Sequence, residues 1–231
     1  MADIVERKFG EMGFLPARKG NNVWAMATEY DAEKPTILLD AHLDTVKPNA
    51  SWTRNPYEPV IEGDRLYGLG SNDTGGSLVA LLSVFSRLAE REQPYNLVML
   101  ASAEEEVTGV NGVRAVLPEL GKIDFAIVGE PTQLQPAVAE KGLLVLDCVA
   151  HGRAGHAGYM FTNNALSAVT EAVHWINTLN QFHSQETDTT VNVGVFHAGE
   201  KRNIVAESAT VGWDIRTSNL EIKAQVEECI E

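Results

Sequence analysis

A short apolar stretch that ends in a histidine and an aspartate constrains the fold of this chain more than any other feature: residues 36–46 read TILLDAHLDTV. Its β-branched residues and leucines, preceded by Pro35, are typical of a buried strand in an α/β sheet. His42 and Asp44 stand two residues apart, so an extended backbone directs both side chains to the same face. Open α/β sheets bind their ligands at the carboxyl ends of the strands. We therefore expect a metal site here, with His42 binding an ion and a nearby carboxylate fixing its tautomer.

Two later apolar segments, which also predict strands, end in acidic residues in the same way. Residues 97–102 (LVMLAS) lead to the run 104–106 (EEE), and residues 125–128 (FAIV) lead to Glu130. Helical segments lie between the strands, and one of them, residues 77–88, is apolar nearly all round, which predicts a buried helix. The alternation predicts an α/β fold with a mostly parallel sheet, helices on both faces and a ligand site along one edge.

Asp73 is a further candidate, in the glycine-rich turn of residues 68–76 (GLGSNDTGG). This turn is not a phosphate loop, because its GxGxxG pattern is incomplete and no GK[ST] follows. Within the run 104–106, adjacent carboxylates at a strand end point different ways, so one can bind a metal while its neighbour acts as a base. One imidazole with three carboxylates suits Zn²⁺, Co²⁺ or Mn²⁺. A bridging carboxylate such as Asp73 would hold two ions about 3.5 to 4 Å apart.

Each of these motifs has a simpler explanation when it is taken alone. The HxD motif could be a strand end with one satisfied histidine and one capping aspartate. Asp73 could cap the following helix, because aspartate is a preferred N-cap residue. The run 104–106 could be a solvated charge run, and Glu130 could shape a turn before the proline that follows it. The metal hypothesis is favoured by their occurrence together in one chain.

Composition limits the class of protein. The 231 residues carry a net charge of −14, so nucleic acid is not an expected partner, because phosphate binding needs clustered lysine and arginine. No apolar run approaches the roughly 18 to 20 residues of a transmembrane helix, and the amino terminus lacks the pattern of a signal peptide. Cys148 and Cys229 have no paired spacing, which argues against a disulfide framework and against a thiolate zinc site. We expect a cytoplasmic protein with no membrane partner.

The pattern of segments changes near residue 141, so we expect two domains, over residues 1–141 and 142–231. The second domain has the order strand, helix, strand, strand, helix. That order suits an α+β layer of ferredoxin type whose last strand is absent. The expected segments are residues 143–150, 164–179, 189–196, 209–215 and 221–231.

Six motifs in a fixed order resemble those of the dinuclear zinc aminoacylase and peptidase family: HLDTV, GLGSNDTGG, AEEEVTG, VGEPT, AEKG and GHA. Within that family they are most similar to the acetylornithine deacetylase branch, beside succinyl-diaminopimelate desuccinylase, aminoacylase and glutamate carboxypeptidase. The resemblance runs through nearly the whole chain. It implies a zinc-peptidase-like catalytic domain, a ferredoxin-like lid and dimerisation domain, and two zinc ions for which cobalt or manganese could substitute.

The resemblance also implies roles for residues of the first domain. Asp44 would orient His42, and Glu105 would be the general base. Glu104 would occupy the place that the family usually gives to an aspartate. The metal ligands would be His42 for one ion, Asp73 as the bridge, Glu106 for the first ion and Glu130 for the second.

In the second domain, the resemblance implies residues that reach a substrate. His156, in the motif GHA, would act in the active site of the partner subunit of a homodimer that forms through the lid. Asn203 and Arg216, in KRNIV and DIR, match lid residues that hold the substrate.

The reaction implied by the resemblance is removal of the acyl group from an N-acyl amino acid. We expect N-acetyl-ornithine or N-succinyl-ornithine, in arginine biosynthesis, although no local signature distinguishes the acetyl from the succinyl group. The alternatives within the class are another N-acyl-amino-acid deacylase or desuccinylase, or a metallo-exopeptidase. The alternative of another class is a catalytically inactive dimerising fragment.

The chain is shorter at both ends than the family pattern. Members ordinarily have a longer amino-terminal helix, and a carboxy-terminal segment that completes both domains and supplies one more zinc-binding histidine. No histidine follows His197. We therefore expect both domains to be incomplete, and the chain by itself to be inactive for lack of that ligand.

Overall fold

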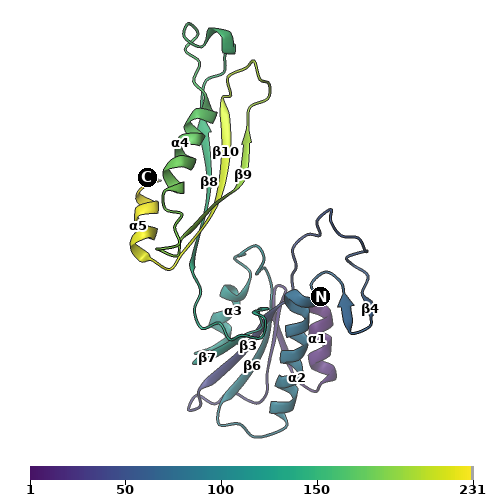
Figure 1. Cartoon of the computed structure of the whole chain (residues 1–231). Coiled ribbons are helices and arrows are strands. Elements are labelled where there is room, and N and C mark those ends of the chain that lie inside the picture. The colour runs from purple at the N-terminus through teal and green to yellow at the C-terminus, as the bar shows by residue number, and fades with distance from the viewer. Residues whose placement is uncertain (230–231) are drawn as a thin grey trace. The chain divides into compact units, whose positions relative to one another are not determined.

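The computed structural model describes residues 1–229, which form two compact units, Met1–Pro136 and residues 137–229 (Figure 1). We describe each unit by itself. The last two positions of the helix expected over 221–231 lie outside the described residues.

The first unit is built on a five-stranded sheet of order β1-β2-β6-β3-β7. β3 pairs in parallel with β6 and with β7, whereas β2 pairs antiparallel with β6 and with β1. Four of the five strands therefore run in the same direction, which confirms the expected mostly parallel sheet. The strands are β1 (Pro16–Lys19), β2 (Asn22–Met26), β3 (Thr36–His42), β6 (Asn96–Ser102) and β7 (Phe125–Val128). A separate hairpin consists of β4 (Val60–Glu62) and β5 (Arg65–Tyr67).

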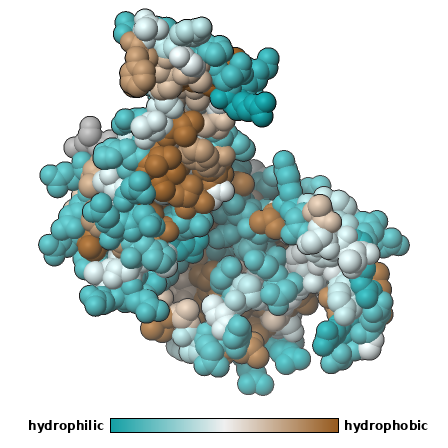
Figure 2. Space-filling view, turned by 45° about the horizontal axis from the view of Figure 1, so that its top comes forward, coloured by the Kyte–Doolittle hydropathy of each residue, from teal (hydrophilic) through white to brown (hydrophobic). Residues whose placement is uncertain are grey.

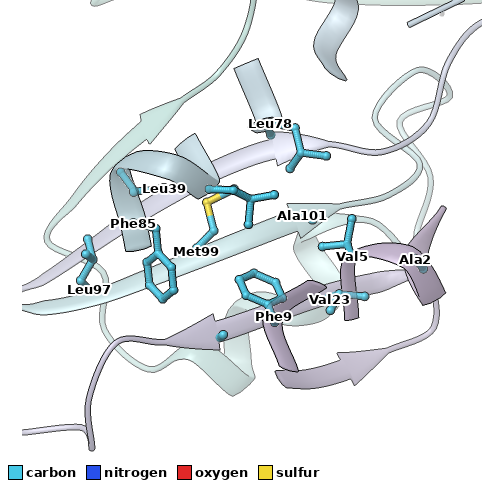
Figure 3. Packing of buried hydrophobic residues seen from close by; sticks show 13 residues of the cluster. Ala2, Val5, Phe9, Val23, Leu39, Leu78, Phe85, Leu97, Met99 and Ala101 are labelled. Atoms are coloured by element: carbon cyan, nitrogen blue, oxygen red, sulfur yellow. The ribbon is translucent and has the colours of Figure 1, made fainter. Parts of the chain in front are cut away.

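Helices cover both faces of this sheet, as the sequence predicts. Leu39 of β3 packs with α1 (Ala2–Glu11) and α2 (Ser77–Ala89). Between these helices, Phe9 meets Phe85 edge to face, with ring centroids 6.1 Å apart (Figure 3). Leu38 alternates to the opposite face and packs with Val116 of α3 (Val113–Leu120). Both faces of β3 are thus buried in apolar cores.

The helix expected to be buried all round is buried on one side only. α2 places Leu78, Leu82 and Phe85 in the core, but the side chain of Val79 is 67% exposed in the first unit. The expectation was wrong because the apolar composition of a helix does not determine on how many sides other elements pack against it. β7 is also partly exposed. Among the described residues it is an edge strand of the sheet, and Phe125 is 59% exposed.

The second unit is a three-stranded antiparallel sheet with both of its α-helices on one face. The strand order is β8-β10-β9, so β10 lies between the two strands that α4 connects, in the expected split βαβ arrangement. Its elements are β8 (Gly142–His151), the short 3₁₀ helix η2 (Ala157–Tyr159), α4 (Ala168–Asn180), β9 (Thr190–Ala198), β10 (Ser208–Thr217) and α5 (Leu220–Glu228). Trp213, Ile215 and Val226 are central to its core.

The surface is largely polar. Figure 2 shows a mostly hydrophilic face on which the exposed apolar residues gather in a few patches. Among the described residues, no helix has the length and apolar character needed to cross a membrane.

The buried carboxyl of Asp40 makes the stability of the first unit depend on pH. Its side chain is buried in β3, and this burial raises the pKa of its carboxyl from 3.8 to about 6 against the opposing effects of Ser102 and His42. Because the folded state holds the proton more tightly than the unfolded state, stability is lost as the pH rises from about 4 to about 6. The loss amounts to about 3 kcal/mol, since one pKa unit corresponds to about 1.4 kcal/mol.

We therefore predict that Asp40→Asn removes part of the pH dependence of folding. Between about pH 4 and pH 8, the unfolding free energy of the metal-free variant should fall by about 3 kcal/mol less than that of the unaltered protein. Denaturant unfolding at both pH values measures this difference. An identical pH dependence in the two proteins would contradict the assignment.

Candidate metal centre

Strand pairing brings the expected ligands to one edge of the first sheet. His42 of β3 pairs with Ser102 of β6, and Asp40 of β3 pairs with Val128 of β7. Because these three strands are parallel and in register, the residues that follow them leave the sheet at the same edge. His42, the turn of residues 104–106 and Glu130 lie there. Asp73 comes from η1 (Ser71–Gly76), an irregular helical segment that leads into α2.

The imidazole of His42 is buried and faces carboxylates. Its Nδ1 lies 2.9 Å from the main-chain carbonyl oxygen of Asp44, which can only accept, so Nδ1 carries the proton. In the neutral ring, Nε2 is then an acceptor. It lies 3.0 Å from Asp73 Oδ1, 3.8 Å from Glu105 Oε2 and 3.9 Å from Glu130 Oε2. Since acceptors do not bond to one another, a proton or a metal cation is needed between them.

The charges show the same need for a cation. Burial by itself would lower the pKa of His42, but the Asp44 carbonyl and the carboxylates of Asp73 and Glu105 outweigh burial and raise that pKa. Burial raises the pKa of Glu130, and the carboxylates of Asp73 and Glu105 raise it further. Both groups thus bind protons more tightly than usual. A divalent cation would displace these protons and stabilise the clustered carboxylates.

The side chains present fit such a cation. Ligand atoms of His42, Asp73 and Glu106 all lie within 4.8 Å of one another. Glu130 lies close to the same imidazole nitrogen. One nitrogen with several carboxylate oxygens is a donor set that suits Zn²⁺, Co²⁺ or Mn²⁺. The geometry therefore brings together all four residues that the sequence proposed as metal ligands.

Asp44 connects His42 to the acidic turn. Its carboxylate accepts the backbone N–H of Glu105 at 3.3 Å and that of Glu106 at 3.1 Å. The Oδ1 atom stands 3.6 Å from His42 Nδ1, so the carbonyl of Asp44 is the nearer acceptor for the ring. Asp44 can thus hold the imidazole by its main chain and the two glutamates by its side chain.

Glu104 faces its own loop and not the imidazole. Its carboxylate accepts the backbone N–H of Asn111 at 3.0 Å and the side-chain amide of Asn111 at 3.1 Å. The loop folds back so closely that a Cβ at Gly109 would lie 2.5 Å from the Cβ of Glu104. Among the three consecutive glutamates, Glu105 and Glu106 are therefore the two that reach the site of His42.

Asn22 is a supporting residue that sequence reasoning missed. It is fully buried at the start of β2, and its amide donates to the carbonyls of Lys19 at 3.0 Å and Asn111 at 2.6 Å. Its Oδ1 accepts the backbone N–H of Ala103 at 2.9 Å. These bonds fix both ends of the loop that carries Glu104, Glu105 and Glu106. No local signal could have revealed the role, because the two loop partners lie 81 and 89 positions along the chain.

In the second unit, the structure brings His156 close to Asn203. His156 pairs with Ile204 in a β-bridge, and the N–H of Ala157 donates to the carbonyl of Asn203 at 3.0 Å. His156 Nδ1 accepts the N–H of Gly158 at 3.1 Å, so the proton of the neutral ring resides on the exposed Nε2. That nitrogen is available as a donor.

Arg216 lies away from this pair. It is near the end of β10, about 26 Å along the strand from Ser208 at about 3.3 Å per residue. Its guanidinium makes two bonds to Asp214, at 2.9 and 3.0 Å. Within one chain, Arg216 and the pair of His156 and Asn203 are thus at opposite ends of the second unit.

Comparison with known proteins agrees with this centre. Residues 38–230 match the model of peptidase family M20/M25/M40, and the chain belongs to this family. The chain is 30% identical over 224 residues to an acetylornithine deacetylase of Pectobacterium carotovorum, an alignment that covers 90% of this chain and 58% of that protein. It is 32% identical over 220 residues to a probable carboxypeptidase of Aspergillus terreus, covering 88% of this chain and 49% of that protein. The chain thus spans about half of the length of these relatives.

A solved structure shows the same fold. An M20 family metallo-carboxypeptidase of Sulfolobus solfataricus superposes with a TM-score of 0.77 at 19% identity, over 99% of this chain and 69% of that one. The expected family and the expected fold class are both confirmed.

We predict that Glu106→Gln weakens binding of Zn²⁺ or Co²⁺ by at least about 10-fold, because it removes the charge of an expected ligand of the cluster. Glu104→Gln is the matched control. It removes the same charge from the same turn, but its amide oxygen can still accept from Asn111. Isothermal titration calorimetry with each ion measures the affinities. Equal losses in the two variants would mean that the general charge of the turn, and not ligation by Glu106, governs binding.

Proposed function

We propose that this protein is a metal-dependent amidohydrolase that removes the acyl group from an N-acyl amino acid, with N-acetyl-ornithine as its preferred substrate. The observation that carries the proposal is the acceptor nitrogen of the buried His42, which faces Asp73, Glu105 and Glu130. Such a set binds cations and has a spare carboxylate for proton transfer. Family membership and the deacetylase relatives support the choice of reaction.

The residues have the following roles in this proposal. Two divalent ions, when bound, lower the pKa of a water molecule and polarise the acyl carbonyl. Asp73 would be the ligand that the two ions share, Glu106 would be a ligand of one ion and Glu130 of the other, and His42 would be a further ligand, oriented by Asp44. Glu105 accepts the proton of the attacking water and returns it to the departing amine. The products are a carboxylate and a free amino acid.

The second unit supplies substrate contacts in this proposal. Residues 1–141 form the catalytic domain, and residues 142–231 form a lid that also makes a homodimer. His156 donates from Nε2 to the oxyanion that develops in the partner's site. Asn203 and Arg216 bind substrate. The position of Arg216 about 26 Å along β10 from Ser208, the end nearer to Asn203, supports a dimer, because two copies could then bring both residues to one small substrate.

A second candidate is metallo-exopeptidase activity. It is favoured by the carboxypeptidase relative of Aspergillus terreus, which is as similar in sequence as the deacetylases. The two reactions hydrolyse the same kind of amide bond, so the metal centre serves either. Release of ornithine from N-acetyl-ornithine and from N-succinyl-ornithine, measured beside hydrolysis of dipeptides, distinguishes the two functions. Faster turnover of dipeptides would replace the deacylase proposal with the peptidase one.

We predict that Glu105→Gln lowers kcat by about 10²- to 10⁴-fold and leaves both metal ions bound, because it removes a general base and not a ligand. The assay uses the full gene product that contains this sequence, with metal content measured on the same sample. Glu104→Gln is again the control and should retain activity. Loss of metal together with activity would make Glu105 a ligand and move the base elsewhere in the turn.

We also predict that His156 acts across a dimer. Mixing inactive His156→Ala subunits with inactive Glu105→Gln subunits should restore activity, because one of the two sites in a heterodimer then has both groups. Subunits are exchanged under mild denaturation, and the activity of the mixture is compared with that of each variant alone. Mixtures that exchange subunits but stay inactive would show that His156 serves its own chain.

A further inference from the structure

Thr74 links the two segments that carry Asp73 and Glu130. Its side chain is 2% exposed, and its hydroxyl donates to the main-chain carbonyl of Gly129 at 2.6 Å. Thr74 follows Asp73 directly, and Gly129 precedes Glu130 directly. Among the hydrogen bonds of the described residues, this is the one that connects η1 with the turn after β7. It therefore ties together the backbones that bear two of the expected metal ligands.

At Gly129, where the turn after β7 begins, one backbone hydrogen bond and close packing accompany the bond from Thr74. The N–H of Gly129 donates to the carbonyl of Asp40 at 2.7 Å, which continues the sheet by one more bond. Gly129 has no side chain, and an added Cβ would lie 2.8 Å from the Cβ of Ser77 and 3.2 Å from that of Ala41. The backbone thus fits closely between β3 and the start of α2. The hydroxyl of Thr74 is the side-chain donor that holds its carbonyl.

The charges make such a link necessary. Asp73 and Glu130 both lie close to the His42 imidazole nitrogen Nε2, at 3.0 and 3.9 Å from it. Without a cation, the two carboxylates repel each other. Asp73 lies in the irregular helical segment η1 and Glu130 in the turn after β7, so neither is held within a strand of the sheet. A neutral bond between their backbones opposes that repulsion and adds no charge to the cluster.

We propose that Thr74 is a positioning residue that presets the separation of Asp73 and Glu130 for the second of two divalent ions. The inference rests on the two-ion site of the proposed function. It makes a claim about affinity for metal, which can be tested without any turnover assay. The first ion depends on His42 and Glu106 as well as Asp73, so it should depend less on Thr74.

The experiment is a titration of the metal-free full chain with Zn²⁺ and Co²⁺, in the unaltered protein and in three variants. Thr74→Val keeps the shape of the side chain and removes the donor. We expect it to weaken the second ion by about 10- to 100-fold, the usual effect of removing a supporting partner of a ligand. Thr74→Ser restores the donor and should bind both ions as the unaltered protein does.

Thr36→Val is the matched control for a general loss of stability. Thr36 is also a buried threonine, at the opposite end of β3, and its hydroxyl is within 3.3 Å of the Asn96 amide. Its removal should lower the melting temperature and leave both metal affinities unchanged. The visible spectrum of Co²⁺ responds to the ligands and geometry of each bound ion, so the change in absorbance between the first and the second equivalent of Co²⁺ reports the second site.

Three results would overturn the inference. One is unchanged affinity for the second ion in Thr74→Val. Another is a loss in Thr74→Ser as large as in Thr74→Val, which would assign the effect to packing of the methyl group. The third is binding of a single ion by the unaltered protein, which would remove the two-ion site as well. Two tightly bound ions in a protein that hydrolyses no N-acyl amino acid would remove the proposed reaction and leave the role of Thr74 standing.

Discussion

The in-register parallel pairing of β3 with β6 and β7 is the constraint on which the candidate metal centre depends. Side chains alternate along a strand, so a slip of one residue would turn His42 to the other face and separate it from the carboxylates. The register is held by packing on both sides of β3, where Leu38 and Leu39 enter different cores. The apolar residues in the middle of the strand therefore fix the position of the polar residue at its end.

Several carboxylates lie close together in the candidate metal centre, and hydrogen bonds around it hold them in place. Asp44 binds the N–H groups of Glu105 and Glu106, and Glu104 closes the same loop on itself through Asn111. These contacts give three identical residues in a row different surroundings. A carboxylate that is satisfied by its own loop stabilises structure, whereas one that is left facing an imidazole nitrogen can bind a cation or move a proton.

Much of this could be predicted from sequence, because the signals were local. An apolar run followed by polar residues predicted β3 with His42 at its end. The same pattern predicted β6 with the glutamates of residues 104–106 after it, and β7 with Glu130 after it. The features that the sequence did not predict depend on residues that are close in space but distant in the chain. Apolar composition predicted that α2 is buried on every side, although Val79 is exposed. The bonds of Asn22 join residues far apart in the chain, and no periodicity or motif reports such a bond.

Asn22 has a consequence for the dynamics of the site. By bonding Ala103 and Asn111, it makes the loop of Glu105 and Glu106 part of the same cooperative unit as β2. Opening of the hairpin of β1 and β2 would then remove the bonds of Asn22 and loosen that loop, which the contacts of Asp44 and Glu104 still hold. The amide hydrogens of β2 and of the loop should exchange with solvent at similar rates, so that a disturbance among the first 26 residues reaches the candidate metal site without touching it.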